Sequence, residues 1–271
     1  MSTQQNNQIT TNLPDYRLDG KVAIITGSAR GIGRAIADVM AAFGAKVVIA
    51  DIRVEDSQKA AAEIAAAGGT AVGFGVDVTN AESRQGLVEA TVAEFGRVDI
   101  LVNNAGIGGK PIKLIDMDED YYDRFMDVDL KAVYFMSQAV ARQMKAQGYE
   151  AGTHPYRIIN LSSAAAIKSP IGDTVYGSAK AAVAHLTRIM ANELARFGIT
   201  CNAIAPGYVL TDMTKDVMKD EKNVAAVTRM ISLRRYAMPA DIAAVVNFLA
   251  SPAGGYLTGV LLPVDGGMTI N

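Results

Sequence analysis

The sequence predicts an α/β protein in which one doubly wound parallel sheet of about seven strands carries helices on both faces. Short apolar runs rich in β-branched residues alternate with longer helical patterns along most of the 271 residues. A glycine-rich turn joins the first such run directly to the first helical pattern. No Gly/Ser/Pro-rich linker divides the chain, so these elements are expected to form a single domain.

Composition limits the kinds of function that the chain can serve. Half of the residues are hydrophobic and 20% are charged, as in globular domains, and a net charge of −2 provides no basic surface for nucleic acid. The single cysteine, Cys201, excludes an intramolecular disulfide and fits a reducing compartment. With only His154 and His185 besides, no protein-built metal site is expected.

The ends of the chain and its longest apolar runs bear on its location. No uninterrupted apolar run approaches the ~18–20 residues that a membrane span requires. The first residues lack a basic segment and a hydrophobic core, so no secretory signal is expected and we predict a cytoplasmic protein. Residues 1–16 are rich in amides and threonine and are predicted to form a flexible tail, followed by one domain over 17–271.

The first strand leads into a candidate phosphate site. The apolar run 21–26 is followed by Gly27-Ser28-Ala29-Arg30-Gly31-Ile32-Gly33 and then by a helical pattern that ends at Gly44. When a strand, a glycine-rich turn and a helix follow one another, the backbone N–H groups of the turn and the positive end of the helix dipole form a site for an anion. The glycines allow close approach of a pyrophosphate. The pattern therefore favours a Rossmann-like dinucleotide site, although a tight turn alone would explain the glycines.

Asp51 ends the second predicted strand, 46–50. A carboxylate at this point suits the ribose 2′-hydroxyl of NAD and repels the 2′-phosphate of NADP. Arg30, inside the glycine turn, argues the other way because a guanidinium can pair with that phosphate. We weight Asp51 more heavily, and NAD is the expected cofactor over NADP.

The next elements complete the first half of the sheet. An alanine-rich helix over 56–66 stops at Gly68-Gly69, strand 70–76 closes with Asp77 and Val78, and a helix spans 81–95. Asp77 suits either an adenine amino group or a helix N-terminus. Strand 98–102 precedes Asn103-Asn104-Ala105-Gly106, small and amide residues that suit the crevice where doubly wound sheets bind ligands.

The second half continues the alternation. Residues 118–147 are helical by composition, and their first acidic residues are interpreted as solvated charge in a first turn. The remaining elements are expected at strand 157–161, helix 175–197, strand 200–205 followed by Pro206-Gly207, mixed and mobile helical segments over 210–233, helix 239–250 and strand 260–264.

Tyr176 and Lys180 are the candidate catalytic pair. They are four residues apart in a helix-favouring run, so they share one helix face. A cation about 4 Å from a phenol favours the ionised form by roughly 4 kcal/mol, which brings proton transfer into the neutral range. Ser163 follows the apolar run 157–161 and is placed to donate a hydrogen bond to a substrate oxygen.

Taken in order, these motifs resemble the short-chain dehydrogenase/reductase family in its compact single-domain form. The likeness covers about 17–268 and rests on Thr26-Gly27-x-x-x-Gly31-x-Gly33, Asn103-Asn104-Ala105-Gly106, Ser163, Tyr176-x-x-x-Lys180 and Pro206-Gly207. It implies that Tyr176 is the acid/base, that Ser163 polarises the carbonyl, and that Lys180 favours the ionised tyrosine and holds the nicotinamide ribose.

The resemblance also implies a cofactor site, a lid and an assembly. The lid corresponds to 210–233, and a homotetramer would form through the two long helices, 118–147 and 175–197, with His185 facing the contact. The implied dinucleotide contacts are Gly27, Arg30, Gly31, Ile32, Gly33, Asp51, Asp77, Val78, Asn104, Ala105, Gly106, Tyr176, Lys180, Pro206, Gly207, Val209 and Thr211.

Asp129 departs from the family pattern, which usually has asparagine at this position. That asparagine holds, through its backbone carbonyl, a water that links the lysine to solvent, and an aspartate offers the same carbonyl. The added charge is expected to raise the pKa of Lys180 and to offset part of its effect on Tyr176. We therefore expect retained activity with an altered pH profile.

The sequence supports one leading function and two alternatives. The leading hypothesis is NAD-dependent interconversion of a secondary alcohol and its ketone, with a polyol, a sugar or another small or cyclic alcohol as substrate. An NADPH-dependent 3-oxoacyl-[acyl-carrier-protein] reductase shares all of these motifs, but Asp51 argues against it. A non-catalytic dinucleotide-binding protein on the same fold is the remaining alternative.

Overall fold

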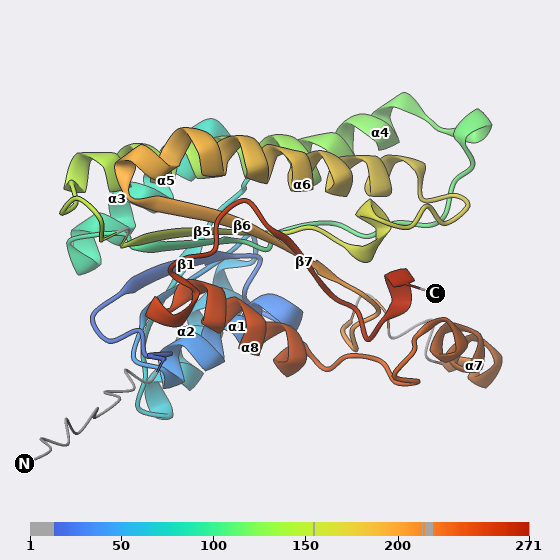
Figure 1. The fold of residues 1–271 in the computed structure, drawn as a ribbon, viewed down its shortest axis with the longest axis horizontal. Coiled ribbons are helices and arrows are strands. Elements are labelled where there is room, and N and C mark those ends of the chain that lie inside the picture. The colour runs from blue at the N-terminus through green and yellow to red at the C-terminus, as the bar shows by residue number, and fades with distance from the viewer. Residues whose placement is uncertain (1–13, 154, 213, 215–218, 271) are drawn as a thin grey trace, which may run out of the picture.

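The computed structural model describes residues 14–153, 155–212, 214 and 219–270. Within these residues, seven parallel strands form one sheet in the order β3-β2-β1-β4-β5-β6-β7 (Figure 1). Every neighbouring pair is parallel, as predicted. The strands are β1 Val22–Thr26, β2 Lys46–Asp51, β3 Thr70–Gly75, β4 Ile100–Asn103, β5 Tyr156–Leu161, β6 Ile199–Pro206 and β7 Leu261–Val264.

Helices cover both faces of the sheet, so the protein has three layers (Figure 1). Helices α1, α2 and α8 pack on one face, while α3, α5 and α6 pack on the other. The helices are α1 Gly31–Ala42, α2 Val54–Ala66, α3 Ala81–Phe95, α4 Glu119–Met126, α5 Ala132–Gln147, α6 Thr174–Leu194, α7 Glu221–Met230 and α8 Pro239–Ala250.

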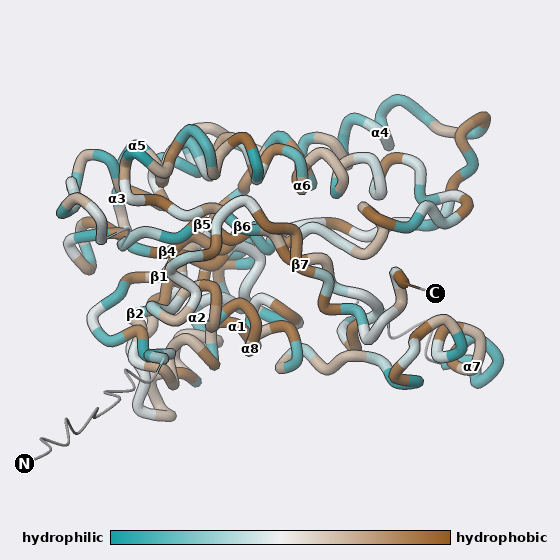
Figure 2. The backbone as a smooth tube through the Cα atoms, in the orientation of Figure 1, coloured by the Kyte–Doolittle hydropathy of each residue, from teal (hydrophilic) through white to brown (hydrophobic). Residues whose placement is uncertain are grey.

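The central strands are apolar throughout because they are buried on both faces. Every residue of β1, β4, β5 and β6 is buried, which explains why these strands read as continuous apolar runs and not as alternating ones. Figure 2 shows the hydrophobic residues concentrated in this central layer, while polar residues lie on the outer surfaces of the helices. Cys201 lies in buried β6, and burial raises the pKa of its thiol to about 12, as expected for a packing residue.

A buried polar network connects β4 and β5 to the helices above them. Asn103 donates from Nδ2 to Asn160 Oδ1 and to Ser137 Oγ, each at 2.8 Å, and Asn160 Nδ2 donates to Thr187 Oγ1 at 2.9 Å. Buried amides are tolerated when they are hydrogen-bonded, and such a network favours a single arrangement of the strands and helices that it joins. It therefore fixes β4 and β5 relative to α5 and α6.

The strand order changes direction between β1 and β4. The chain moves outward from β1 through β2 to β3 and then returns to add β4 on the other side of β1. In such sheets the loops that leave the two central strands diverge, which opens a crevice beyond their carboxyl ends. The glycine turn and the Asn103–Gly106 motif both follow these two strands, so they lie at this crevice.

The long helical stretch predicted over 118–147 is divided in the structure. Helices α4 and α5 are joined by a π-helical turn, Asp127–Lys131, which contains the buried Asp129. A π turn widens the helix by one residue and is frequent at functional sites. Helical composition gave no signal for this change, because the residues of the turn suit an α-helix equally well.

The two segments predicted as a tail, 1–16, and as a lid, 210–233, lie partly outside the described residues. Of the predicted tail 1–16, residues 14–16 are described, and the carbonyl oxygens of Asp15 and Tyr16 accept hydrogen bonds from Ala253 N and Asn247 Nδ2. Within the predicted lid 210–233, residues 213 and 215–218 are not described, and α7 forms its second half. No helix in the described part of the chain has the length and apolar character needed to cross a membrane.

Candidate active site

The three glycines of the first turn are required for different physical reasons. Gly27 and Gly31 adopt φ angles of 62°, in the left-handed region that favours glycine. Gly33 has no such angle, but a Cβ there would lie 2.5 Å from Asn104 Nδ2 and 2.5 Å from Gly27 O. Asn104 fills that space, donating from Nδ2 to the carbonyl oxygens of Thr26 and Gly27 at 2.9 Å. The turn and the loop after β4 are thus fastened together as one bare backbone cradle, which fits a pyrophosphate.

Asp51 ends β2 beside this cradle, with its carboxylate held in place. Oδ2 accepts from Ala29 N and Oδ1 accepts from Arg53 N, each at 3.2 Å, and the side chain is largely buried. Arg30, which the sequence offered as a partner for a 2′-phosphate, is exposed and forms an ion pair with Asp212 at 3.3 Å. The carboxylate of Asp51 therefore holds the position next to the cradle, as a ribose 2′-hydroxyl acceptor requires.

Asp77 follows β3 and forms a turn before α3. Its Oδ1 accepts from Thr79 Oγ1 at 2.6 Å and from Thr79 N at 2.9 Å, and these hydrogen bonds lower the pKa of Asp77. The N-cap of α3 is Asn80, whose side chain accepts from Ser83 N at 2.8 Å. The sequence reasoning missed Asn80, although asparagine is among the strongest N-cap residues and could have indicated it.

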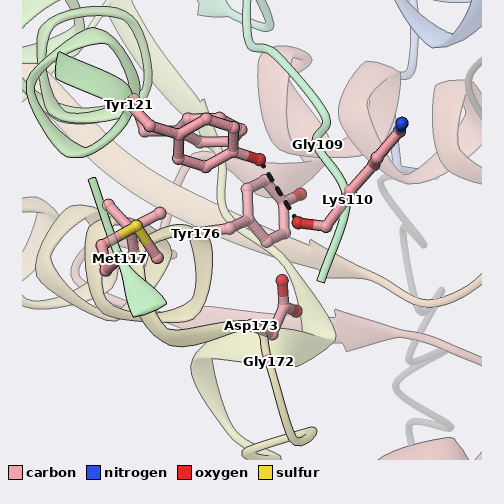
Figure 3. A pocket seen from close by; sticks show the side chains of 9 residues that line it. Gly109, Lys110, Met117, Tyr121, Gly172, Asp173 and Tyr176 are labelled. Carbon is pink, nitrogen blue, oxygen red and sulfur yellow. Dashed lines mark hydrogen bonds between the residues drawn. The ribbon is translucent and has the colours of Figure 1, made fainter. Parts of the chain in front are cut away.

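Tyr176 and Lys180 lie one turn apart on α6, as the spacing predicted. The ammonium group of Lys180 lies 5.6 Å from the centroid of the Tyr176 ring and donates to Leu161 O at 3.2 Å. Lys180 is buried, whereas Tyr176 is half-buried and lines a small cavity (Figure 3). Ser163 stands directly beyond β5, where its Oγ accepts from Ala165 N at 3.1 Å at the start of the short 3-10 helix Ala164–Ala166.

Asp129 reaches Lys180 from the π-helical turn. Its Oδ1 lies 2.9 Å from Lys180 Nζ in an ion pair that is almost fully buried, and its Oδ2 accepts from Ile107 N at 3.2 Å. Burial alone lowers the pKa of Lys180, but attraction to Asp129 and to Tyr176 outweighs it, so the net shift is upward. The ammonium near Tyr176 is therefore shared with a buried carboxylate and does not act as a bare cation.

Gly106 makes room for this ion pair. A Cβ at Gly106 would lie 2.7 Å from Asp129 Oδ1 and 3.4 Å from Lys180 Nζ, so any larger residue would displace the carboxylate. The sequence assigned Gly106 to the cofactor only. The structure adds a second requirement for glycine at this position, which is space for the Asp129 carboxylate. This requirement comes from the contact between the loop after β4 and the π turn, two segments that are distant in sequence.

The parallel sheet brings the predicted site residues to one edge. Gly27, Asp51, Asp77, Asn104, Ser163 and Gly207 each end or follow a strand, from β1 to β6, and the carboxyl ends of parallel strands share an edge. Beside them, Ala105 N donates to Thr26 Oγ1 at 3.0 Å, and the methyl group of Thr211 lies 3.7 Å from where a Gly31 Cβ would stand. Ile32 is half-buried in the core beneath, and Val209 forms a parallel bridge with Ala237.

Other predicted residues stay apart from the site. His185 is exposed on α6, and Asp118 is the N-cap of α4, where its Oδ1 accepts from Tyr121 N at 3.0 Å. Among the described residues, no group of three or more His, Cys, Asp or Glu side chains is arranged to hold a metal ion. What the site does contain is a half-buried phenol, a buried ammonium and a hydroxyl beside a cradle suited to a dinucleotide.

Sequence and structure comparisons reveal relatives that cover nearly the whole chain. A family model described as enoyl-(acyl carrier protein) reductase matches residues 27–269. The 3-oxoacyl-[acyl-carrier-protein] reductase FabG of Vibrio cholerae is 41% identical over 93% of this chain and 98% of its own. The 2-dehydro-3-deoxy-D-gluconate 5-dehydrogenase of Dickeya dadantii is 37% identical over 94% and 98%.

A solved structure shows the same architecture with ligands bound. The structure of 7α-hydroxysteroid dehydrogenase complexed with NADH and 7-oxo glycochenodeoxycholic acid superposes with a TM-score of 0.86 and 38% identity, covering 93% of this chain and 96% of that one. The match in structure agrees with the seven-stranded parallel sheet of this chain. The chain therefore belongs to the short-chain dehydrogenase/reductase family and is an NAD(P)-dependent oxidoreductase that acts on CH–OH groups.

Proposed function

We propose that this enzyme interconverts a secondary alcohol and its ketone with NAD, and that its substrate is a polyol, a sugar or another small or cyclic alcohol. The observation that carries the proposal is the position of Tyr176. It lines a cavity formed by the loop after β4, by α4 and by the start of α6, and the ammonium of Lys180 lies 5.6 Å from the centroid of its ring. A cation beside a phenol stabilises the phenolate, which is the form that accepts a proton from an alcohol.

Three side chains carry the proposed chemistry. In the oxidative direction, the ionised phenol oxygen of Tyr176 takes the proton of the substrate hydroxyl and becomes a neutral hydroxyl, while Ser163 donates a hydrogen bond to the same substrate oxygen. Lys180 stabilises the ionised phenol and is held in place by Leu161 O and Asp129. NAD, when bound, accepts the hydride that leaves the substrate carbon. Well-placed donors to such an oxygen contribute roughly 3–4 kcal/mol each to transition-state stabilisation.

The preference for NAD rests on Asp51. Its carboxylate is fixed next to the glycine cradle by Ala29 N and Arg53 N, where it accepts from a ribose hydroxyl and repels a phosphate. The two arginines at this position are both engaged by carboxylates, Arg30 by Asp212 and Arg53 by Asp51 and Asp56. The 7α-hydroxysteroid dehydrogenase with a similar structure was solved with NADH, which supports this preference.

The second candidate is an NADPH-dependent 3-oxoacyl-[acyl-carrier-protein] reductase. It is favoured by the 41% identity to the Vibrio cholerae enzyme of that name and opposed by Asp51. A panel of secondary alcohols with NAD and NADP, assayed beside an acetoacetyl thioester with NADH and NADPH, separates the two. The proposal requires NADH formation from an alcohol with NAD; thioester reduction that needs NADPH would replace it with the second candidate.

We further infer that copies of the chain assemble as a homotetramer through α4, α5 and α6. These helices expose Tyr122, Tyr134, Phe135 and Ile189, between 38% and 48% accessible each, which is unfavourable in a monomer. Light scattering during size-exclusion chromatography gives the mass directly. A mass near that of one 28.6 kDa chain would exclude the tetramer.

A further inference from the structure

The cavity that Tyr176 lines is also lined by a carboxylate, that of Asp173. It is lined by the loop after β4, by α4 and by the start of α6, and its walls include Met117, Tyr121, Phe125, Asp173 and Tyr176 (Figure 3). Asp173 lies three residues before Tyr176 on the same segment of chain. In Figure 3 its carboxylate is directed toward the same space as the hydroxyl of Tyr176.

Asp173 occupies the N-cap position of α6 but does not cap the helix. Asn80, Asp118 and Asp220 hold the same position in α3, α4 and α7, and each accepts a hydrogen bond from a backbone N–H. The side chain of Asp173 accepts none. An acidic residue at a helix start is normally explained by capping, and that explanation fails here.

The backbone around Asp173 is fixed although its carboxylate is not bonded. Ile112 N donates to Gly172 O at 2.8 Å, Gly177 N donates to Asp173 O at 2.9 Å, and Ile112 forms a parallel bridge with Asp173. The side chain therefore projects into the cavity from a rigid position. Precise placement of this kind is what a substrate-contacting residue needs.

Nothing in the described part of the chain neutralises this carboxylate. Asp173 is half-buried, makes no hydrogen bond or ion pair with a described side chain, and burial raises its pKa. The Lys180 ammonium is engaged by Asp129, and the Lys110 ammonium points away from Asp173 (Figure 3). The pKa of the Tyr208 phenol, beyond β6, is raised mainly by burial and to a smaller extent by the negative charge of Asp173. A partly desolvated carboxylate without a partner costs free energy that a donor group on a ligand would recover.

We propose that Asp173 determines specificity by accepting a hydrogen bond from a second donor group of the substrate, a hydroxyl or an ammonium on the carbon next to the reacting one. This inference rests on the proposed function, because it places the reacting carbon at Tyr176. The apolar side chains of Met117 and Phe125 line the rest of the cavity and suit the carbon skeleton. A substrate with a carboxylate in place of the donor is disfavoured, since two negative charges would face each other in a partly buried site.

A matched set of three-carbon alcohols tests this assignment. In 2-propanol, 1,2-propanediol, 1-amino-2-propanol and lactate, the same secondary alcohol carries a methyl, hydroxymethyl, aminomethyl or carboxylate group. Each oxidation converts the alcohol and NAD⁺ into the ketone, NADH and a proton. The wild-type enzyme and Asp173→Ala and Asp173→Asn variants are compared by kcat/KM. Glu94→Ala, which removes an exposed carboxylate from α3, serves as the control.

The expected result is a loss confined to substrates with a donor. Asp173→Ala should lower kcat/KM for the diol, the amino alcohol or both by about 10-fold or more, and should leave kcat/KM for 2-propanol within about twofold of wild type. Glu94→Ala should leave kcat/KM for all of these substrates unchanged. If the diol is affected, the source of the donor is a hydroxyl; if only the amino alcohol is, it is an ammonium. Asp173→Asn removes the negative charge that would repel the carboxylate of lactate, so kcat/KM for lactate relative to that for 2-propanol should rise.

Two different failures can be told apart. Equal losses on 2-propanol and on the donor substrates, or no loss on any of them, would overturn the role of Asp173 while leaving the proposed function intact. Absence of NADH formation by the wild-type enzyme from every alcohol tested would overturn the proposed function, and this inference with it. Unfolding of each variant in urea shows whether a loss reflects folding instead, and the Asp173→Asn variant preserves the side-chain shape for that comparison.

Discussion

The ammonium of Lys180 and the carboxylate of Asp129 form a 2.9 Å ion pair in which both side chains are almost completely buried. The pair lies between the helix that carries Tyr176 and the π-helical turn that separates α4 from α5. A buried carboxylate that screens the cation cannot leave the field at the phenol unchanged. The same ion pair also holds α6 against the π turn, so it contributes both to the field at Tyr176 and to the stability of the fold.

Replacing Asp129 with asparagine should shift the pH dependence of turnover. Burial lowers the pKa of Lys180, and the attraction to Asp129 that counteracts this effect is lost in the variant. As long as the ammonium is charged, its field at Tyr176 is no longer partly cancelled by the carboxylate. The acidic limb of kcat in alcohol oxidation should move to lower pH, with activity retained. Steady-state kcat measured across the pH range tests this. An unchanged profile would make Asp129 a bystander in proton transfer.

Removing one partner of the ion pair should lower the unfolding free energy of the protein. Lys180→Met leaves the Asp129 carboxylate buried without its counter-charge and is expected to cost about 3–5 kcal/mol of unfolding free energy. Because the pKa of Lys180 is raised above its ordinary 10.5, the lysine's contribution is complete at neutral pH and is lost only as the pH rises past the raised value.

A double variant shows whether this cost comes from the unpaired charge. Lys180→Met combined with Asp129→Asn removes both charges and should be more stable than Lys180→Met alone when both are unfolded in urea at pH 7. If the two single losses simply add, the residues are not coupled and the electrostatic interpretation of the contact is wrong.

Removing the hydroxyl group of Tyr176 separates catalysis from cofactor binding. Tyr176→Phe keeps the ring beside Lys180 but deletes the proton acceptor, so kcat should fall by at least about 100-fold. NADH affinity, followed by fluorescence titration, should remain within a few-fold of wild type. Tyr256→Phe changes a fully exposed tyrosine near the start of β7 and is the matched control. Parallel loss of turnover and NADH binding in Tyr176→Phe would indicate a structural tyrosine.

Cofactor preference should follow the carboxylate of Asp51. Asp51→Ala removes the acceptor beside the glycine cradle together with its repulsion of a 2′-phosphate. The ratio of kcat/KM for NAD to that for NADP should therefore fall by about 10-fold or more, as expected for loss of a hydrogen bond to a charged group. Glu55→Ala, an exposed acid in the first turn of α2, should leave the ratio unchanged. If both variants keep the wild-type ratio, NAD preference has another origin.

Much of the architecture could be predicted from local sequence. The apolar runs marked all seven strands within one or two residues. The signal has a clear physical reason in β1, β4, β5 and β6, where every residue is buried and the sequence is largely apolar on both faces of the sheet. The spacing of Tyr176 and Lys180 predicted a shared helix face, and the glycine pattern predicted the cradle after β1. These features depend on residues close together in the chain.

The features that the sequence did not reveal depend on contacts between distant segments. The π turn around Asp129 is stabilised where α4 and α5 meet α6 and the loop after β4, and its composition is that of any polar helix. Asp173 has the residue type of a helix cap, and only its missing capping bond and its place in the cavity set it apart. Similarly, nothing near Asn103 in sequence shows that it bonds to Asn160 across the sheet.

Gly106 and Gly86 offer a paired test of the contact between the ion pair and the loop after β4. Gly106→Ala places a methyl group too close to Asp129 Oδ1, since the Cβ would be only 2.7 Å from that oxygen. The carboxylate must move, so the variant should lose stability, by on the order of 1–3 kcal/mol, and should show the same shift of the kcat profile as Asp129→Asn. Gly86→Ala has open space in the middle of α3 and should instead stabilise the protein by about 0.5–1 kcal/mol. Urea unfolding and kcat against pH measure both effects, and a Gly106→Ala enzyme with wild-type stability and pH profile would show that the loop yields without disturbing the pair.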